Sequence, residues 1–184
     1  MTINLKNNIV NYRKKTIEQL DIITLLGEQN LEFKKQEINL KEINTTDLSV
    51  FELKNVLYLF VIRDWGDVKN GAELCSAISI LKADKSNPKL PKVNTPQGKN
   101  ILYLGKSTGN FKTRLKQHLG GYSHSTYSLQ FSSWTDKLKT MKIDLYYTQV
   151  DFNTAKNHNT NDLLELLETA LHLEHQPFLG RSGH

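Results

Sequence analysis

A phenol, a guanidinium and an imidazole lie within one short stretch of the sequence, at Tyr103, Arg114 and His118. Gathered at one corner of a fold, these groups could bind a phosphate and stabilise the charge that develops in its transition state. Taken alone, the same residues also fit an ordinary cationic surface helix. Which reading holds depends on the elements that position the three side chains.

A strand, a turn and a helix are predicted in that order for residues 101–119. The apolar run that opens this stretch favours a strand, and the glycines behind it favour a turn. The helix follows from apolar residues at every fourth position, which are Phe111, Leu115 and Leu119. At about 100° per residue, Arg114 and His118 lie along the edge of that apolar face, above the turn and Tyr103.

The sequence Gly105-Lys106-Ser107 is not a phosphate-binding P-loop. That loop needs four residues between its two glycines, so that consecutive amides curl around a phosphate. Here the nearest earlier glycine is Gly98, and the residues between Gly98 and Gly105 include the apolar strand itself. Nucleotide binding of the P-loop type is therefore excluded.

The net charge of +5 is modest but unevenly distributed. Between Lys85 and Thr135 there is no aspartate or glutamate, whereas lysines and one arginine recur throughout this stretch. This asymmetry indicates a polyanionic partner, although a solvated lysine-rich loop is the plainer alternative. Six lysines are candidate DNA contacts: Lys89, Lys92, Lys99, Lys106, Lys112 and Lys116.

The 184 residues, 38% hydrophobic and 23% charged, describe an ordinary globular domain with one sizeable core. A single cysteine, Cys75, can form no intrachain disulfide and excludes a zinc cluster of several cysteines. No apolar run approaches the length of a membrane span, and no secretory segment opens the sequence. We therefore expect a cytoplasmic protein with no membrane partner.

Residues 1–50 have the pattern of an accessory layer, with a helix at 1–27 and a strand or hairpin at 31–44. The run VLYLFVI at 56–62 predicts a central strand buried on both sides. It is apolar throughout, rich in β-branched and aromatic residues, and too short to favour a helix. This run should anchor the sheet.

Four further elements follow the central strand. A helix is predicted at 70–81 with Asn70 as its N-cap, and a basic loop punctuated by prolines is predicted at 85–99. A strand at 143–150 and a last helix at 161–175 complete the pattern. The loop is a candidate segment for ordering on DNA.

Glu168 is the carboxylate of interest on the last predicted helix. It lies at the edge of the apolar face, beside Leu164 and Leu171, where it would be partly desolvated and would need a partner. That partner is either a lysine or arginine of the core or a divalent metal, for which carboxylate oxygen is a natural ligand. His172 and His175 match no zinc motif, and we expect them on the surface.

Together these residues resemble the GIY-YIG nuclease family. The resemblance rests on Tyr58 in VLYLF, Tyr103 in LYLGKS, Arg114 and His118 in FKTRLKQH, and Glu168 nine residues before Pro177. It implies an α+β fold in which a small antiparallel three-stranded sheet is flanked by helices. The nuclease domain would span 51–184 with an insertion at about 64–100. The resemblance itself covers residues 56–180.

Three departures from the family pattern are visible. Val56-Leu57-Tyr58 replaces Gly-Ile-Tyr, which keeps the phenol and loses the glycine. Forty-four residues lie between Tyr58 and Tyr103, where the family has a short hairpin. Gly180 stands where many members have an asparagine after the proline.

The resemblance implies a role for each site residue. Glu168 would hold one Mg²⁺ (or Mn²⁺) that supports the leaving oxygen, and Arg114 would neutralise the phosphate. Tyr58 would act as general base or hold the attacking water, with Tyr103 in a related positioning role and His118 orienting a tyrosine or the phosphate. The alternative is structural: the tyrosines as core aromatics and Arg114 with Glu168 as a buried ion pair.

The function expected from the resemblance is that of a Mg²⁺-dependent endonuclease acting on double-stranded DNA. The chain looks most like the restriction-enzyme members, and palindromic cutting would imply a homodimer. The alternative is a catalytically inactive GIY-YIG-like module that binds nucleic acid. A phosphate-handling enzyme for small substrates is a third reading, against which the breadth of the basic stretch argues.

Overall fold

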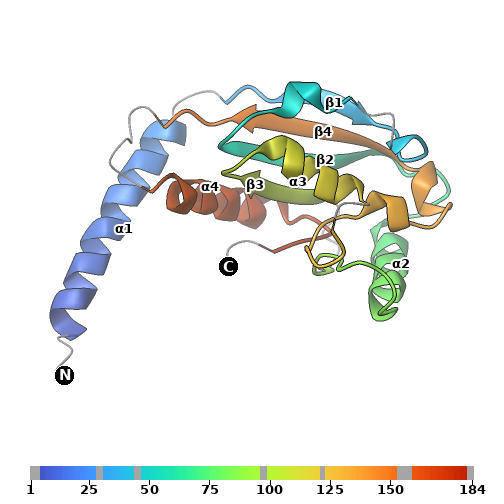
Figure 1. Ribbon diagram of the computed structural model, residues 1–184. Helices are drawn as coiled ribbons and strands as arrows, with labels where there is room; N and C mark the ends of the chain where they lie inside the picture. The colour runs from blue at the N-terminus through green and yellow to red at the C-terminus, as the bar shows by residue number, and fades with distance from the viewer. Residues whose placement is uncertain are drawn as a thin grey trace.

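A four-stranded antiparallel sheet forms the centre of the molecule (Figure 1). The computed structural model describes residues 5–27, 31–43, 47–95, 99–120, 123–152 and 159–181. The strands are β1 (Lys34–Ile38), β2 (Val56–Asp64), β3 (Ile101–Ser107) and β4 (Lys142–Gln149). Their order across the sheet is β1-β4-β2-β3. The α+β class predicted from the sequence is confirmed.

The strand β2 is central, as its apolar run predicted. It pairs with β3 on one side and β4 on the other, so that Tyr58 lies between Gly105 and Tyr147. Successive side chains of a strand point to opposite faces. Tyr58 and Phe60 therefore join the main core, whereas Leu57 joins a second core on the other face. Burial on both faces explains why the run shows no alternation.

The sheet has four strands where the sequence predicted three, because β1 from the N-terminal layer pairs with β4. All of β1 except Ile38 is exposed, so its hydrophobic pattern carries little signal. The pairing is supported by charge, since Asp144 of β4 is buried and bonded by Lys35 at 3.0 Å and by Arg63 at 3.2 Å. Residues 34–38 thus belong to the same sheet as the central strand.

Helices cover both faces of the sheet (Figure 1). The described helices are α1 (Leu5–Gly27), which projects away from the sheet, α2 (Gly71–Ala83), which lies beyond its other end, and α3 (Phe111–Leu119) and α4 (Thr160–His175), which pack on its two faces. The apolar face of α3 packs in the main core with Tyr58, and the leucines of α4 pack in the second core with Leu57. α4 also lies along β3, so it borders the edge of the sheet that carries Tyr103. No helix among the described residues is long and apolar enough to cross a membrane.

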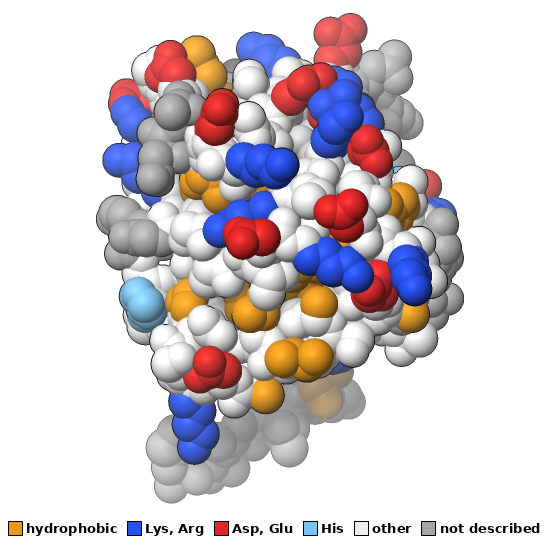
Figure 2. All heavy atoms as spheres, turned by 90° about the vertical axis from the view of Figure 1, so that its right-hand side faces the viewer, with side chains coloured by type: hydrophobic (Ala, Val, Ile, Leu, Met, Phe, Trp, Pro, Cys, Tyr) orange, Lys and Arg blue, Asp and Glu red, His pale blue; other side chains and the backbone are white. Residues whose placement is uncertain are grey.

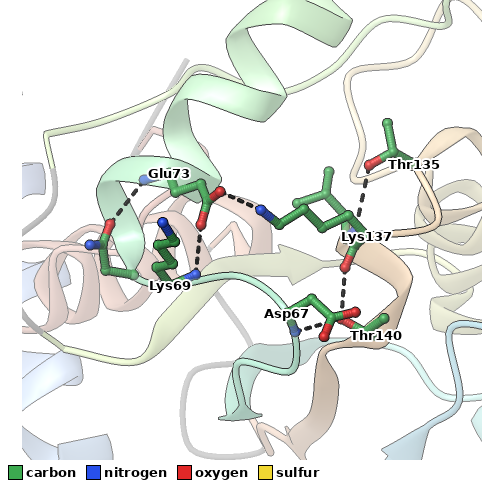
Figure 3. Close-up of polar contacts among 8 residues, drawn as sticks. Asp67, Lys69, Glu73, Thr135, Lys137 and Thr140 are labelled. Carbon is green, nitrogen blue, oxygen red and sulfur yellow. Dashed lines mark hydrogen bonds and ion pairs between the residues drawn. The ribbon is translucent and has the colours of Figure 1, made fainter.

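The helix α2 lies within the long connection between β2 and β3, residues 65–100, and polar bonds fasten it to the segment before β4 (Figure 3). Asn70 caps the helix as predicted, its side chain accepting the Glu73 N–H at 3.0 Å. Glu73 accepts the Lys69 N–H and pairs with Lys137. The Asp67 N–H donates to the Thr140 hydroxyl at 2.8 Å. The connection is therefore anchored at its beginning.

The end of the molecule that carries α2 has no surface of a single charge. Figure 2 shows this end, where basic and acidic side chains are intermixed with apolar ones. Ion pairs such as Lys142–Asp64 contribute to the mixture. A polyanion would find little net attraction on this surface.

Gly66 provides a test of the anchor of the β2–β3 connection. Its φ is +54°, and a Cβ there would lie 2.4 Å from the Thr140 hydroxyl oxygen and 2.6 Å from its carbonyl oxygen. Gly66→Ala should destabilise the fold by about 2 kcal/mol or more, which lowers Tm by about 4–8 °C. Thermal unfolding followed by circular dichroism measures the change.

Gly109→Ala is the matched control, because a Cβ at Gly109 meets nothing within 4 Å. Its Tm should stay within about 1–2 °C of the parent, in line with other surface changes. An equal loss in both variants would contradict the tight contact between Gly66 and Thr140.

Candidate active site

The phenol of Tyr58 lies in the middle of the sheet and is completely buried. Gly105 faces it across the β2–β3 ladder, and a Cβ at Gly105 would lie 2.6 Å from the Tyr58 hydroxyl oxygen. The same Cβ would lie 2.8 Å from the ring of Tyr103. A glycine at this position therefore makes room for both phenols.

Arg114 of α3 connects both phenols. Its Nε donates to the Tyr58 hydroxyl at 3.1 Å, and its Nη2 donates to the Tyr103 hydroxyl at 3.2 Å. Nη1 donates to the Gln117 side chain at 2.9 Å, and Nη2 also donates to the Tyr127 carbonyl at 3.1 Å. Burial works against the charge, but the two phenols raise the pKa of Arg114, so the guanidinium stays charged. The fork of Arg114 thus fixes two strands and a loop relative to α3.

His118 is buried behind Tyr58. Its Nδ1 accepts the Leu129 N–H at 3.2 Å, so the proton of the neutral ring lies on Nε2, which donates to the Tyr58 hydroxyl at 2.9 Å. Burial and then the charge of Arg114 lower the pKa of His118 well below its usual value. The neutral imidazole is therefore a positioning group for Tyr58 in this state.

Tyr58 is a neutral phenol in this arrangement. Burial raises its pKa, and the nearby charge of Arg114 opposes that rise only in part. Its oxygen accepts two N–H donors, which hold the ring firmly in place. Because burial outweighs these bonds, the phenol loses its proton with difficulty. Tyr103, whose hydroxyl shares the same guanidinium, is also mostly buried but lines an open cavity.

Glu168 of α4 borders the same site. Its side chain is 8% exposed, and burial raises its pKa to about 7, with the charge of Lys106 as the largest opposing effect. Its charge acts on Tyr58 and Arg114 as well. The prediction of a desolvated carboxylate is borne out by its burial. Lys106 itself pairs with Glu165 at 3.1 Å.

A Mg²⁺ ion fits this donor set better than a zinc ion does. Among the described residues, no three side chains of His, Cys, Asp or Glu converge on one point. Mg²⁺ keeps several waters and often uses one or two protein carboxylates together with substrate phosphates, whereas structural zinc needs four protein ligands. Glu168, as one buried carboxylate that interacts electrostatically with Arg114, suits the first pattern.

His172 is buried, which corrects the expectation of a surface histidine. Its Nε2 donates to the Leu104 carbonyl at 3.2 Å, because α4 packs against β3 and turns this side chain toward the strand. Burial lowers its pKa. His175, one turn later, is partly exposed as expected. Neither residue joins the cluster around Arg114.

A cavity of about 310 Å³ opens beside Tyr103 and Arg114. Besides these two residues, its lining includes Lys82, Lys92, Tyr127 and Arg181. Lys82, Tyr127 and Arg181 are not among the site residues predicted from the sequence. Of the three, only Arg181 had a local signal, because it directly follows the Gly180 of the family pattern.

The six lysines predicted to contact DNA lie in different surroundings. Lys106 pairs with Glu165, Lys112 pairs with Glu52 at 2.7 Å, and Lys99 donates to the Glu174 carbonyl. The others are Lys92 in the cavity, Lys89 above the Tyr127 ring, and Lys116 on the exposed side of α3. The position of a lysine in the sequence did not show whether its ammonium group is already bound to a carboxylate or carbonyl, as in Lys99, Lys106 and Lys112.

The backbone at residue 180 explains why this position holds a glycine. Its φ is +101°, and a Cβ there would lie 3.0 Å from the ring of Tyr103. An asparagine at this position would need the left-handed region and would press on that ring. Glycine at position 180, where many family members have an asparagine, therefore suits the local backbone.

A family model described as "GIY-YIG catalytic domain" matches residues 56–180, more than half of the chain. The match includes every residue of the cluster around Arg114. Neither the search of curated proteins nor the search of solved structures found a match.

The raised pKa of Glu168 predicts a pH-dependent cost to stability. Below its usual value of 4.5 the group is protonated in both the folded and unfolded states. The cost grows as pH rises from about 4.5 to about 7 and is constant at higher pH. The difference corresponds to about 3 kcal/mol, since each tenfold change in acidity is about 1.4 kcal/mol. Without a metal, Glu168→Gln should therefore raise Tm at about pH 8, by about 6–12 °C.

Thermal unfolding of both chains with a chelator present measures this effect. At about pH 4 the gain should disappear, because the parent carboxyl is then neutral too. A Tm difference that is the same at both pH values would show that the carboxylate is not desolvated.

Proposed function

The chain belongs to the GIY-YIG nuclease family and is therefore an endonuclease, and on this premise we propose that it cuts double-stranded DNA with Mg²⁺ (or Mn²⁺) as cofactor. The observation that carries the proposal is the guanidinium of Arg114, which is bonded to both phenols beside an open cavity. Members of this family generally use divalent metals.

The residues can supply what phosphodiester hydrolysis requires. Arg114 can neutralise the charge of the pentacovalent phosphate, because its fixed charge needs no reorganisation during the reaction. Tyr103 lines the cavity and can hold the attacking water through its hydroxyl, with Tyr58, bonded to the same guanidinium, as a fixed partner. Bound at Glu168, the metal would supply positive charge that supports the departing oxygen.

The cationic lining supports DNA over a small phosphate compound. Lys92 and Arg181 carry the positive surface beyond the catalytic cluster, and a small ligand would be better served by an enclosed pocket. We further propose a restriction-type role in the cytoplasm, in which two copies pair to cut both strands. The β2–β3 connection, which lies beside the cavity, would contribute to recognition.

Cleavage of supercoiled plasmid, with and without Mg²⁺, tests the reaction. The parent should make discrete cuts only with Mg²⁺, and Glu168→Ala should lower the rate by at least about 100-fold. Glu174→Ala is the control, because Glu174 is an exposed carboxylate on the same helix. Its rate should match the parent.

Absence of cutting by the parent, with DNA still retarded in gels, would replace the proposal with the binding module. Absence of both cutting and retardation would remove DNA as the substrate. Equal cutting with and without a chelator would show that the reaction needs no metal ion.

Arg114→Lys tests the bridging role separately from charge. Lysine keeps one positive charge but cannot donate from a planar fork to two phenols at once. We expect kcat to fall by about 100- to 1,000-fold, with a smaller change in DNA affinity. Single-turnover cleavage measures the first and gel retardation the second. A variant with kcat within a few-fold of the parent would show that the bridge is dispensable.

A further inference from the structure

Residues 92–94 of the β2–β3 connection run beside residues 177–180, which follow α4. The Gly180 N–H donates to the Lys92 carbonyl at 2.8 Å, and the Asn94 N–H donates to the Phe178 carbonyl at 2.8 Å. The side chain of Asn94 donates to the carbonyls of Pro177 and Gly180, both at 2.9 Å. This pairing sets Lys92 and Arg181 beside each other.

The paired segments are fixed to the sheet. The N–H groups of Phe178 and Leu179 donate to the carbonyls of Ile101 and Leu102 on β3, both at 2.9 Å. Leu179 is fully buried, and Gly180 packs on the ring of Tyr103. The two cations therefore stand at a defined place next to the catalytic phenol.

The loop after α3 contributes Tyr127 to the lining of the cavity. Lys89 joins this loop to the connection, since its N–H donates to the His124 carbonyl at 3.0 Å and its carbonyl accepts the Ser128 N–H at 3.4 Å. The carbonyl of Tyr127 is held by Arg114, yet its ring is 58% exposed, with the Lys89 ammonium 5.4 Å from its centre. An exposed ring fixed by its backbone is suited to stack on a base.

The cations of this cavity outnumber what one phosphate needs. Lys82, Lys92, Arg114 and Arg181 line it, and among the residues that the structure describes no carboxylate does. Lys82 is held by the Pro91 carbonyl at 3.0 Å. A second cavity of about 400 Å³ on the other side shares Lys92, Gly180 and Arg181 with the first. Lys92 and Arg181 therefore border both cavities, and cations spread over two cavities suit an extended strand better than a single phosphate.

Resting on the proposed function, we propose that Lys92 and Arg181 form a second phosphate subsite, which binds the phosphate next to the scissile one on the same DNA strand. Tyr127 stacks on the intervening base. The β2–β3 connection thus contributes directly to substrate binding, through Lys92, in addition to any role in recognising sequence. Arg114 contacts the scissile phosphate, and the pair beside it sets the register of the strand.

Binding of a fluorescent DNA duplex by the Glu168→Ala chain, over a range of salt concentrations, tests the subsite. Adding Lys92→Ala and Arg181→Ala together should weaken binding by about 10-fold or more and reduce the slope of log K against log[salt] by about 1–2. The charge-matched control is Lys34→Ala with Lys41→Ala, because both lysines lie in the N-terminal layer at the far edge of the sheet. The control should weaken binding by less than about 2-fold.

A DNA with one neutral methylphosphonate locates the subsite, once the plasmid experiment has mapped the cut. Neutralising the phosphate next to the scissile one should weaken binding by the Glu168→Ala chain but add nothing to the loss from the paired substitutions. The paired substitutions leave the backbone bonds of residues 92–94 and 177–180 in place, so the Tm should be unchanged.

The outcomes separate the two proposals. If the parent cuts plasmid and the paired substitutions behave like the control, the subsite is wrong and the nuclease proposal stands. If the two losses add independently, Lys92 and Arg181 do not bind that phosphate. If the parent neither cuts nor binds DNA, the proposed function itself fails.

Discussion

The bonds from the guanidinium of Arg114 to the hydroxyls of Tyr58 and Tyr103 are the constraint on which the site depends. They join α3 to β2 and β3, and a third bond adds the loop that carries Tyr127. A buried charge costs several kcal/mol unless its donors are satisfied. The four partners of Arg114 meet that condition, so a shift of either strand would leave a donor unpaired and is opposed by the same bonds.

Burial leaves the guanidinium as the dominant charge of the cluster. The pKa of Tyr58 is raised and that of His118 is lowered, so both are neutral, and the carboxyl of Glu168 is close to half protonated near neutral pH. The free site therefore complements an anion. Under the proposed function, a bound phosphate would supply the negative charge that the buried surroundings lack, and a metal bound at Glu168 would favour its charged form.

Much of this arrangement could be predicted from the sequence, because it follows from strong local patterns. The apolar run of β2 and the four-residue period of α3 place Tyr58, Arg114 and His118, and the apolar face of α4 places Glu168. The pairing of β1 could not be predicted, because an exposed edge strand of charged residues has no hydrophobic alternation. The burial of His172 depends on how α4 rotates against β3, which spacing alone does not determine.

The residues of the cavity were hidden for a different reason. Lys82, Tyr127 and Arg181 are far apart in the sequence, and they meet through the bond of the Lys82 side chain to Pro91 and through backbone pairing between loops. Basic composition indicated the partner correctly as a class, but it counted Lys106 and Lys112, whose charges are already paired with carboxylates. Contacts between irregular segments carry no periodic signal, so composition is the most that such a stretch reveals.

The segment at 177–180 also determines how the sheet ends. β3 is an edge strand, and an uncovered edge presents unpaired N–H and C=O groups to other chains. Here Phe178 and Leu179 bond to that edge, whereas the opposite edge, β1, is protected by its lysines and glutamate. A chain shortened before Phe178 would therefore expose unpaired N–H and C=O groups of β3. Such a chain would aggregate through this strand before a loss of activity could be measured.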